Sequence, residues 1–162
     1  MKRTDDRAPR RASQNHRPRA EFLGSLYESI REGVYIGPLD SDGGTTRGAN
    51  RHLKLMLGFA PEGPDDKVRP FAADRFVDPR ARAAFVAQLR NDGAVSDYLL
   101  RLRRVDDSSI WVEVTATLHV TDNADLTRVE ALVRNVSERR KLEDQGRDLN
   151  HQLLQAEKMA AL

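Results

Sequence analysis

The chain contains no cysteine, and this absence excludes several kinds of site at once. Disulfides, thiolate nucleophiles, iron–sulfur clusters and cysteine-ligated zinc all require that residue. The histidines are few and scattered, and no two of them form an H-x-x-x-H pair; they are His16, His52, His119 and His151. We therefore predict no metal site.

Long hydrophobic runs are also missing. No stretch approaches the roughly 18 apolar residues that a membrane span requires, and no apolar run follows the basic N-terminal residues as it would in a secretory signal. We expect no membrane span and a cytoplasmic protein.

Positive charge is concentrated at the N-terminus. Residues 1–20 carry seven basic side chains against two acidic ones, although the formal net charge of the whole chain is only +2. Residues 1–19 lack apolar periodicity, so we predict a disordered basic leader. Because no aromatic residues are interspersed for base stacking, a solvated leader is favoured over an anchor for nucleic acid or anionic lipid, and no nucleic-acid partner is expected.

Three helices are predicted within residues 20–93. Apolar residues within 20–32 recur on one side of a helix that Gly33 is expected to end. Asn50 is a typical cap for a short helix that Gly58 ends. Asp78 followed by Pro79 is a clear start for a longer helix, which runs to residues 91–93. Two aromatic residues near this region, Phe71 and Phe76, are expected to anchor the intervening segment onto the core.

The remaining pattern is that of strands. Residues 34–36 and 45–49 predict a short hairpin, and the alternating segments 95–104, 110–120 and 126–136 predict three long strands joined by turns at 106–108 and 121–125. Strands that follow one another through short turns form an antiparallel meander. The sequence thus predicts an α+β fold, with a five-stranded antiparallel sheet and helices on one face.

Read in order, several segments resemble motifs of the PAS domain. The similarity covers residues 21–140 and rests on segments 26–34, 49–59, 76–80, 107–113 and 134–140. The last, Arg-Asn-Val-Ser-Glu-Arg-Arg, resembles the family's D-I-T-E-R-K signature. Asn135 replaces the usual Asp, so a hydrogen bond would have to serve where the family has a charge. Ser108 replaces the usual Gly, which suggests a turn that does not depend on positive φ.

The resemblance implies three regions: the leader at 1–19, a PAS sensor domain at 20–137 with its N-terminal helix at 20–32, and a signalling helix at 138–162. The final residues, 155–162, resemble the lead-in to the dimerisation helix of a bacterial sensor histidine kinase, and the chain stops before the phosphoacceptor histidine. The implied signal-transmission junction consists of Asn135, Val136, Ser137 and Glu138.

Apolar residues in the last region recur at alternating steps of four and three, as in the seam of a parallel dimeric coiled coil. The seam residues are Leu142, Gly146, Leu149, Leu153, Ala156 and Ala160. Three heptads are marginal alone, so we expect a homodimer through residues 138–162. The alternative is an amphipathic helix folded back onto its own domain.

No catalytic residues are predicted. The acidic pairs 65–66 and 106–107 lie in turns, and His151 lacks the acidic neighbour of a phosphoacceptor histidine. PAS domains can hold a small ligand between sheet and helices, and the resemblance and the inward pattern together suggest nine candidate lining residues. For each of them a core role is favoured over a lining role: Tyr35, Leu53, Leu57, Phe85, Leu89, Tyr98, Leu100, Val114 and Leu132.

The cofactor, if any, is not identified by the sequence. Covalent flavin photochemistry of the light-oxygen-voltage kind needs a cysteine, and haem of the oxygen-sensing kind needs a histidine on the long helix, where residues 79–92 have none. His52 is a surface residue in the favoured interpretation.

The resemblance implies an input module of a two-component histidine kinase, with kinase domains and a response regulator as partners of the full-length protein. A PAS module for a cyclic-dinucleotide enzyme or a transcription factor, or a free-standing dimerising adaptor, remains open.

Overall fold

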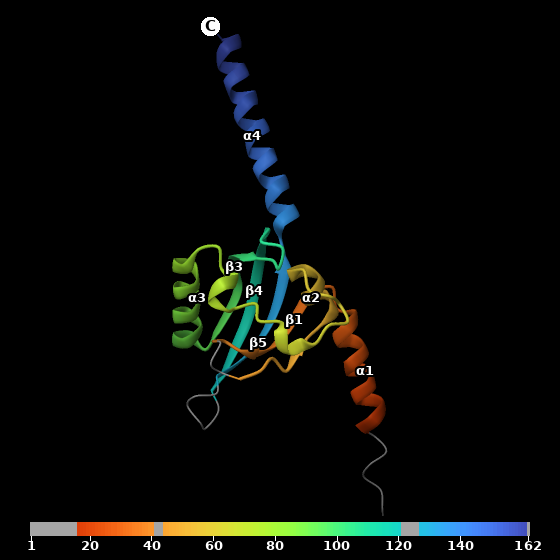
Figure 1. The fold of residues 1–162 in the computed structure, drawn as a ribbon. Helices are drawn as coiled ribbons and strands as arrows, with labels where there is room; N and C mark the ends of the chain where they lie inside the picture. Colours follow the sequence, from red (N-terminus) through yellow and green to blue (C-terminus); the bar gives the residue numbers. More distant parts are fainter. Residues whose placement is uncertain (1–15, 41–43, 121–126, 162) are drawn as a thin grey trace, which may run out of the picture. The chain divides into compact units, whose positions relative to one another are not determined.

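The computed structural model describes residues 16–40, 44–120 and 127–161 (Figure 1). It divides the chain into two compact units, residues 1–30 and 31–162. The first unit contains helix α1 (His16–Ser29), whose start lies within the predicted leader. This helix ends at Ser29, whereas the sequence predicted an end at Gly33. Gly33 instead opens the first strand of the second unit.

The second unit contains one five-stranded antiparallel sheet, in the order β2-β1-β5-β4-β3. This confirms the predicted fold class and the meander of the three long strands. The strands are β1 (Gly33–Pro38), β2 (Gly48–Ala49), β3 (Ala94–Arg103), β4 (Ser109–Val120) and β5 (Thr127–Asn135). The predicted strand at 45–49 is shorter than expected, and the predicted turn at 121–125 lies outside the described residues.

Helices α2 (Arg51–Leu57) and α3 (Pro79–Asp92) are confirmed with the predicted caps. Asn50 Oδ1 accepts a hydrogen bond from the Leu53 amide, and Asp78 accepts one from the Arg80 amide. Such side chains satisfy amide groups that have no partner within the helix, so they fix where the helix begins. Two short 3₁₀ helices, Asp65–Lys67 and Ala73–Arg75, lie between α2 and α3.

Both helices bury residues against the same face of the sheet. Leu53 and Leu57 of α2 and Phe85 and Leu89 of α3 are completely buried with the inward-facing strand residues. Burying an aliphatic or aromatic side chain contributes roughly 1.5–3 kcal/mol, so each of these four side chains stabilises the packing of its helix on the sheet. Figure 1 shows α2 and α3 beside the sheet.

The β3–β4 turn differs from the expectation based on Ser108. Its left-handed residue is Asp107, with a φ of 66°, so the turn does use positive φ, one position earlier. Asp tolerates this conformation better than most side chains do. Asp106 accepts hydrogen bonds from the amide and hydroxyl of Ser108, and these bonds lower the pKa of the Asp106 carboxyl.

Helix α4 (Ser137–Ala160) follows β5 directly and runs without interruption. Every residue from 141 to 161 is exposed, so the described part of the domain does not cover the apolar side of this helix. Within the described residues, no helix is both long and apolar enough to cross a membrane.

Candidate functional site

The predicted pocket residues, with one exception, lie in the interior between sheet and helices. Tyr98 is half-buried and packs against the hydrophobic core. Seven others are at most 1% exposed: Tyr35, Leu53, Leu57, Phe85, Leu89, Leu100 and Val114. Their positions are those of core residues.

Leu132 was wrongly placed in this set. Along β5 the buried residues are Val129, Ala131 and Val133, and Leu132 is 41% exposed. Side chains alternate between faces at every residue of a strand. Leu132 therefore lies on the outer face, in register with Val34 and Thr115.

Aromatic rings fill much of this interior. Phe71 packs edge-on against Tyr35, with ring centroids 5.5 Å apart, and also contacts Phe85 at 5.3 Å. Phe85 in turn contacts Phe76 at 6.2 Å and Tyr98 at 5.3 Å. Phe71 and Phe76 are 1% and 3% exposed, which confirms them as anchors.

The interior holds one buried phenol. The hydroxyl of Tyr35 donates a 2.8 Å hydrogen bond to the carbonyl oxygen of Pro38. Burial raises the pKa of Tyr35, although a hydrogen bond with Thr46 and the charge of Arg69 oppose the shift. The phenol thus stays neutral and bonded, as a buried polar group must.

An ionic clamp closes one side of the interior. Asp40, which follows β1, pairs with Arg82 at 2.7 Å and with Arg90 at 2.6 Å, both on α3. Arg82 also donates to the carbonyl oxygen of Phe71. The clamp holds α3 against the end of β1 and against the aromatic cluster.

The predicted junction residues connect β5 to α4 through hydrogen bonds to one residue of β4, Trp111. The Val136 amide donates to the Trp111 carbonyl at 2.8 Å, and the Trp111 amide donates to Ser137 Oγ at 2.9 Å. Asn135 Oδ1 accepts a 3.0 Å bond from the Ser137 amide. Asn135, the last residue of β5, thus holds the first amide of α4 by a neutral hydrogen bond across two residues.

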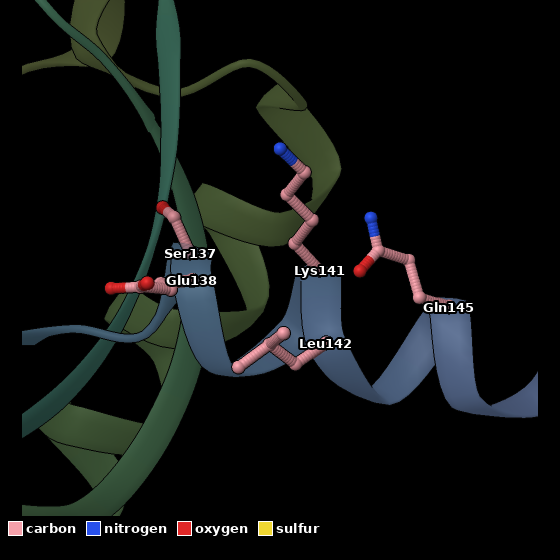
Figure 2. A pocket seen from close by; sticks show the side chains of 5 residues that line it. All are labelled: Ser137, Glu138, Lys141, Leu142 and Gln145. Carbon is pink, nitrogen blue, oxygen red and sulfur yellow. The ribbon is translucent and has the colours of Figure 1, made fainter.

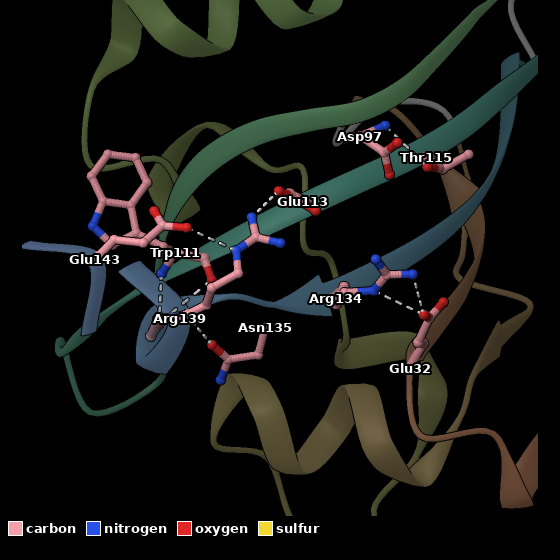
Figure 3. Close-up of polar contacts among 10 residues, drawn as sticks. Glu32, Asp97, Trp111, Glu113, Thr115, Arg134, Asn135, Arg139 and Glu143 are labelled. Atoms are coloured by element: carbon pink, nitrogen blue, oxygen red, sulfur yellow. Dashed lines mark hydrogen bonds and ion pairs between the residues drawn. The ribbon is translucent and has the colours of Figure 1, made fainter. Parts of the chain in front are cut away.

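Two arginines in the first turn of α4 extend these contacts onto β4, and Figure 3 shows the first of them, Arg139, beside Glu113. Arg139 forms an ion pair with Glu113, which is 16% exposed at its side chain, and lies 3.7 Å from Glu143. The hydrogen bond to Glu113 raises the pKa of Arg139. The guanidinium of Arg140 lies over the Trp111 ring, 4.2 Å from its centroid. Backbone, charge and ring contacts therefore all join β4 to α4.

Glu138, the last predicted junction residue, is exposed in the first helical turn. A carboxylate there stabilises a helix because the N-terminal end carries partial positive charge. Glu138 also borders an open hollow along α4, together with Ser137, Lys141, Leu142 and Gln145 (Figure 2).

Sequence reasoning identified the strand side and the helix side of this junction but not their contacts. The family-like motifs contained all four residues that make these contacts. Nothing local in the sequence indicates, however, that Arg139 touches Glu113 or that Arg140 touches Trp111. Glu113 and Arg139 are 26 residues apart. The alternation along the strand places Glu113 on one face of the sheet, and the helical spacing places Arg139 on one side of α4. Only the pairing of β4 with β5 brings these two surfaces together.

The predicted seam residues share one side of α4, and all of them are exposed in the part of the chain that the structure describes. Leu142 and Leu149 are each 61% exposed and Leu153 is 64% exposed. Ala156 is also exposed.

The described residues contain no group of three or more His, Asp or Glu side chains that could hold a metal ion.

Comparisons with known proteins show similarity at the level of structure only. No family model matches the chain, and no curated protein sequence matches it. Among solved structures, an RNA-binding light-oxygen-voltage receptor is similar with a TM-score of 0.62 at 18% identity. The match covers 93% of this chain and 42% of that receptor, so this chain spans less than half of the receptor's length.

Two similar structures come from two-component signalling proteins. A sensory box histidine kinase/response regulator from Burkholderia thailandensis E264 has a TM-score of 0.58 at 19% identity, covering 85% of this chain and 98% of that one. A PAS domain from a two-component sensor histidine kinase has a TM-score of 0.54 at 16% identity, covering 75% and 99%. At such identities the likeness shows the fold alone.

Proposed function

Starting from the PAS fold of this chain, we propose that residues 31–137 are a sensory input module that controls a dimeric signalling helix, α4. The observation that carries the proposal is the direct bonding of β4 to the first turn of α4. A displacement of β4 changes the position of Trp111 and Glu113, and both hold the helix.

The interior of the domain supports a route to this junction. The inward-facing residues Val112 and Val114 of β4 belong to the core cluster, and Trp111 and Glu113 alternate with them. Because one rigid strand carries both sets, a repacking of the core by a ligand or another stimulus would move the outward set as well.

Helix α4 provides the output surface. Its exposed leucines follow the spacing of a two-stranded coiled coil, so we infer that a second copy of the chain covers them. A conformational preference of a few kcal/mol is enough to change the population of two helix arrangements strongly.

The output proposed for the full-length protein is a histidine kinase acting on a response regulator. The support is the sequence resemblance of residues 155–162 to the lead-in of a kinase dimerisation helix, together with two structural neighbours from such proteins. Autophosphorylation with ATP, measured on the chain extended by whatever native residues follow Leu162, tests this output. A diguanylate cyclase activity or a DNA-binding activity in its place would contradict it.

The double variant Leu149→Asp with Leu153→Asp tests the dimeric helix. Charges buried in a seam are costly, so we expect the dimer to dissociate to monomers in light-scattering mass measurements. The matched control places aspartate on the opposite side of α4, with His151→Asp and Lys158→Asp, and should leave the mass unchanged. A seam variant that remains a dimer would place the interface elsewhere and refute the proposal.

A further inference from the structure

Gly146 lies in the middle of the seam, in a place where the chain itself does not require glycine. It is helical, and it is not among the described residues with positive φ. A Cβ atom at this position would meet nothing within 4 Å. Glycine in a helix interior is nonetheless about 1 kcal/mol less favourable than alanine. Among the described residues of one chain, no contact at Gly146 compensates this cost.

In a parallel pair of helices, seam residues of the same number face each other in successive layers. The layer at Gly146 would contain no side chain, while the layers of Leu142 and Leu149 on either side contain two leucines each. Those leucines keep the helix axes apart, so the glycines cannot close the space between them. The Gly146 layer is therefore a gap.

The gap separates two unlike parts of α4. On its N-terminal side, Arg139 and Arg140 bind the first turn to β4, and Leu142 is the only leucine of the seam. On its C-terminal side, Leu149 and Leu153 would form consecutive leucine layers, and both are exposed among the described residues. The N-terminal part of α4 would move with the sheet, and the C-terminal part could pair with a second copy of the chain.

We propose that Gly146 is a weak layer of the dimer that lets the sheet-bound first turns of α4 move while the Leu149 and Leu153 layers stay paired. The interaction surface is thus divided at Gly146, and its partner is a second copy of this chain in parallel register. This inference rests on the proposed dimer and adds the position at which the sensor acts on it.

The test compares Gly146→Ala and Gly146→Leu by sedimentation equilibrium. Alanine removes about 1 kcal/mol of helix cost from each of two chains, which corresponds to a dissociation constant about 30-fold lower. Leucine also fills the gap, so its dissociation constant should be lower still. His151→Leu, which adds a leucine on the opposite side of the helix, is the control and should change the dissociation constant less than threefold.

Single-cysteine variants test the division of the surface, because the native chain has no cysteine to interfere. We expect Leu153→Cys to form disulfide-linked dimers faster than Leu142→Cys. Combined with Gly146→Leu, the two rates should become similar, because the first turns then stay paired. Equal rates in the native glycine background would overturn the weak layer.

The two proposals fail in different ways. If Gly146→Leu weakens a dimer that Gly146→Ala strengthens, the helices approach closely at the glycine, and the gap is refuted while the dimer stands. If neither variant changes the dissociation constant, the gap is refuted in the same way. A native chain that is monomeric, and stays so with Gly146→Leu, refutes the dimer and the gap together.

Discussion

At the scale of single residues, Tyr35 shows how a polar group is accommodated in an apolar interior. Its ring packs on Phe71, and its hydroxyl reaches the carbonyl oxygen of Pro38 in the same strand. The ring passes over Gly37, where a Cβ atom would lie 2.5 Å from the phenol oxygen. Glycine at 37 is thus required by the close approach of the phenol.

Replacing Tyr35 by phenylalanine should lower the free energy of unfolding by about 1–2 kcal/mol, because the buried Pro38 carbonyl loses its partner. Urea unfolding near neutral pH measures the loss. Tyr98→Phe, at a half-buried ring in the same cluster, is the matched control and should cost less. Equal losses in the two variants would contradict the role of the Tyr35 hydroxyl.

The same variant makes a pH-dependent prediction. Burial raises the folded-state pKa of Tyr35 above its ordinary value of 10.0. An acid with a raised folded pKa stabilises the fold fully below its unfolded pKa, and this contribution is lost as the pH rises through the folded pKa. The native chain should therefore lose stability above about pH 10 more steeply than Tyr35→Phe, and parallel curves would contradict the shift.

Single residues were predictable where a local rule applies to them. Asn50 and Asp78 cap their helices as predicted because a cap depends on neighbours within three positions. Leu132 was misplaced because its apolar character was given more weight than the alternation set by Val129 and Val133. Asp97, which has a φ of 48° in a bulge of β3, left no signal in the sequence.

At the scale of elements, β4 is the strand on which the core and the signalling helix meet. Its inward residues pack in the cluster, and its outward residues hold α4. The sequence predicted β4 and α4 separately, within a residue at their starts. The hydrogen bond of Asn135 to the Ser137 amide could be predicted, because it joins residues two positions apart. The contacts of Trp111 and Glu113 with α4 could not, since they depend on the register of β4 with β5.

The Glu113–Arg139 pair should stabilise this meeting by a small but measurable amount. A double-mutant cycle with Glu113→Gln and Arg139→Gln, followed by urea unfolding, should give a favourable coupling free energy, because the Glu113 carboxylate is only 16% exposed although Arg139 is half exposed. The control cycle uses Asp144 and Arg147 of the same helix, which lie 4.0 Å apart and are largely exposed, and should give nearly zero. Equal coupling free energies in the two cycles would contradict a stabilising role for the Glu113–Arg139 ion pair at the junction.

At the scale of the whole molecule, long-range pairs hold the second unit together in ways that no local pattern indicates. Glu32 at the start of β1 binds Arg134 near the end of β5, 102 residues away. Asp40 binds Arg90 across 50 residues. The composition and order of elements predicted the fold class, and these pairs follow from the fold once it has formed.

Helix α4 should depend on protein concentration in a way that the sheet does not. Residues 141–161 of this helix are all exposed in the described structure, so little tertiary packing supports them, and pairing with a second copy should increase their helicity. Far-ultraviolet circular dichroism should show more helix as the protein is concentrated, and the Leu149→Asp, Leu153→Asp variant should show no such rise. A concentration-independent signal in the native chain would contradict the dimer.

The chain has one tryptophan, and it lies at the junction between sheet and helix. The guanidinium of Arg140 rests on its ring, and Arg101 of β3 lies 5.7 Å from the ring centroid. Indole emission is sensitive to nearby cations and to water. The protein therefore carries an intrinsic fluorophore at the junction between β4 and α4. A stimulus that loosens α4 from β4 would shift the emission wavelength or the intensity of Trp111 fluorescence, without any added label.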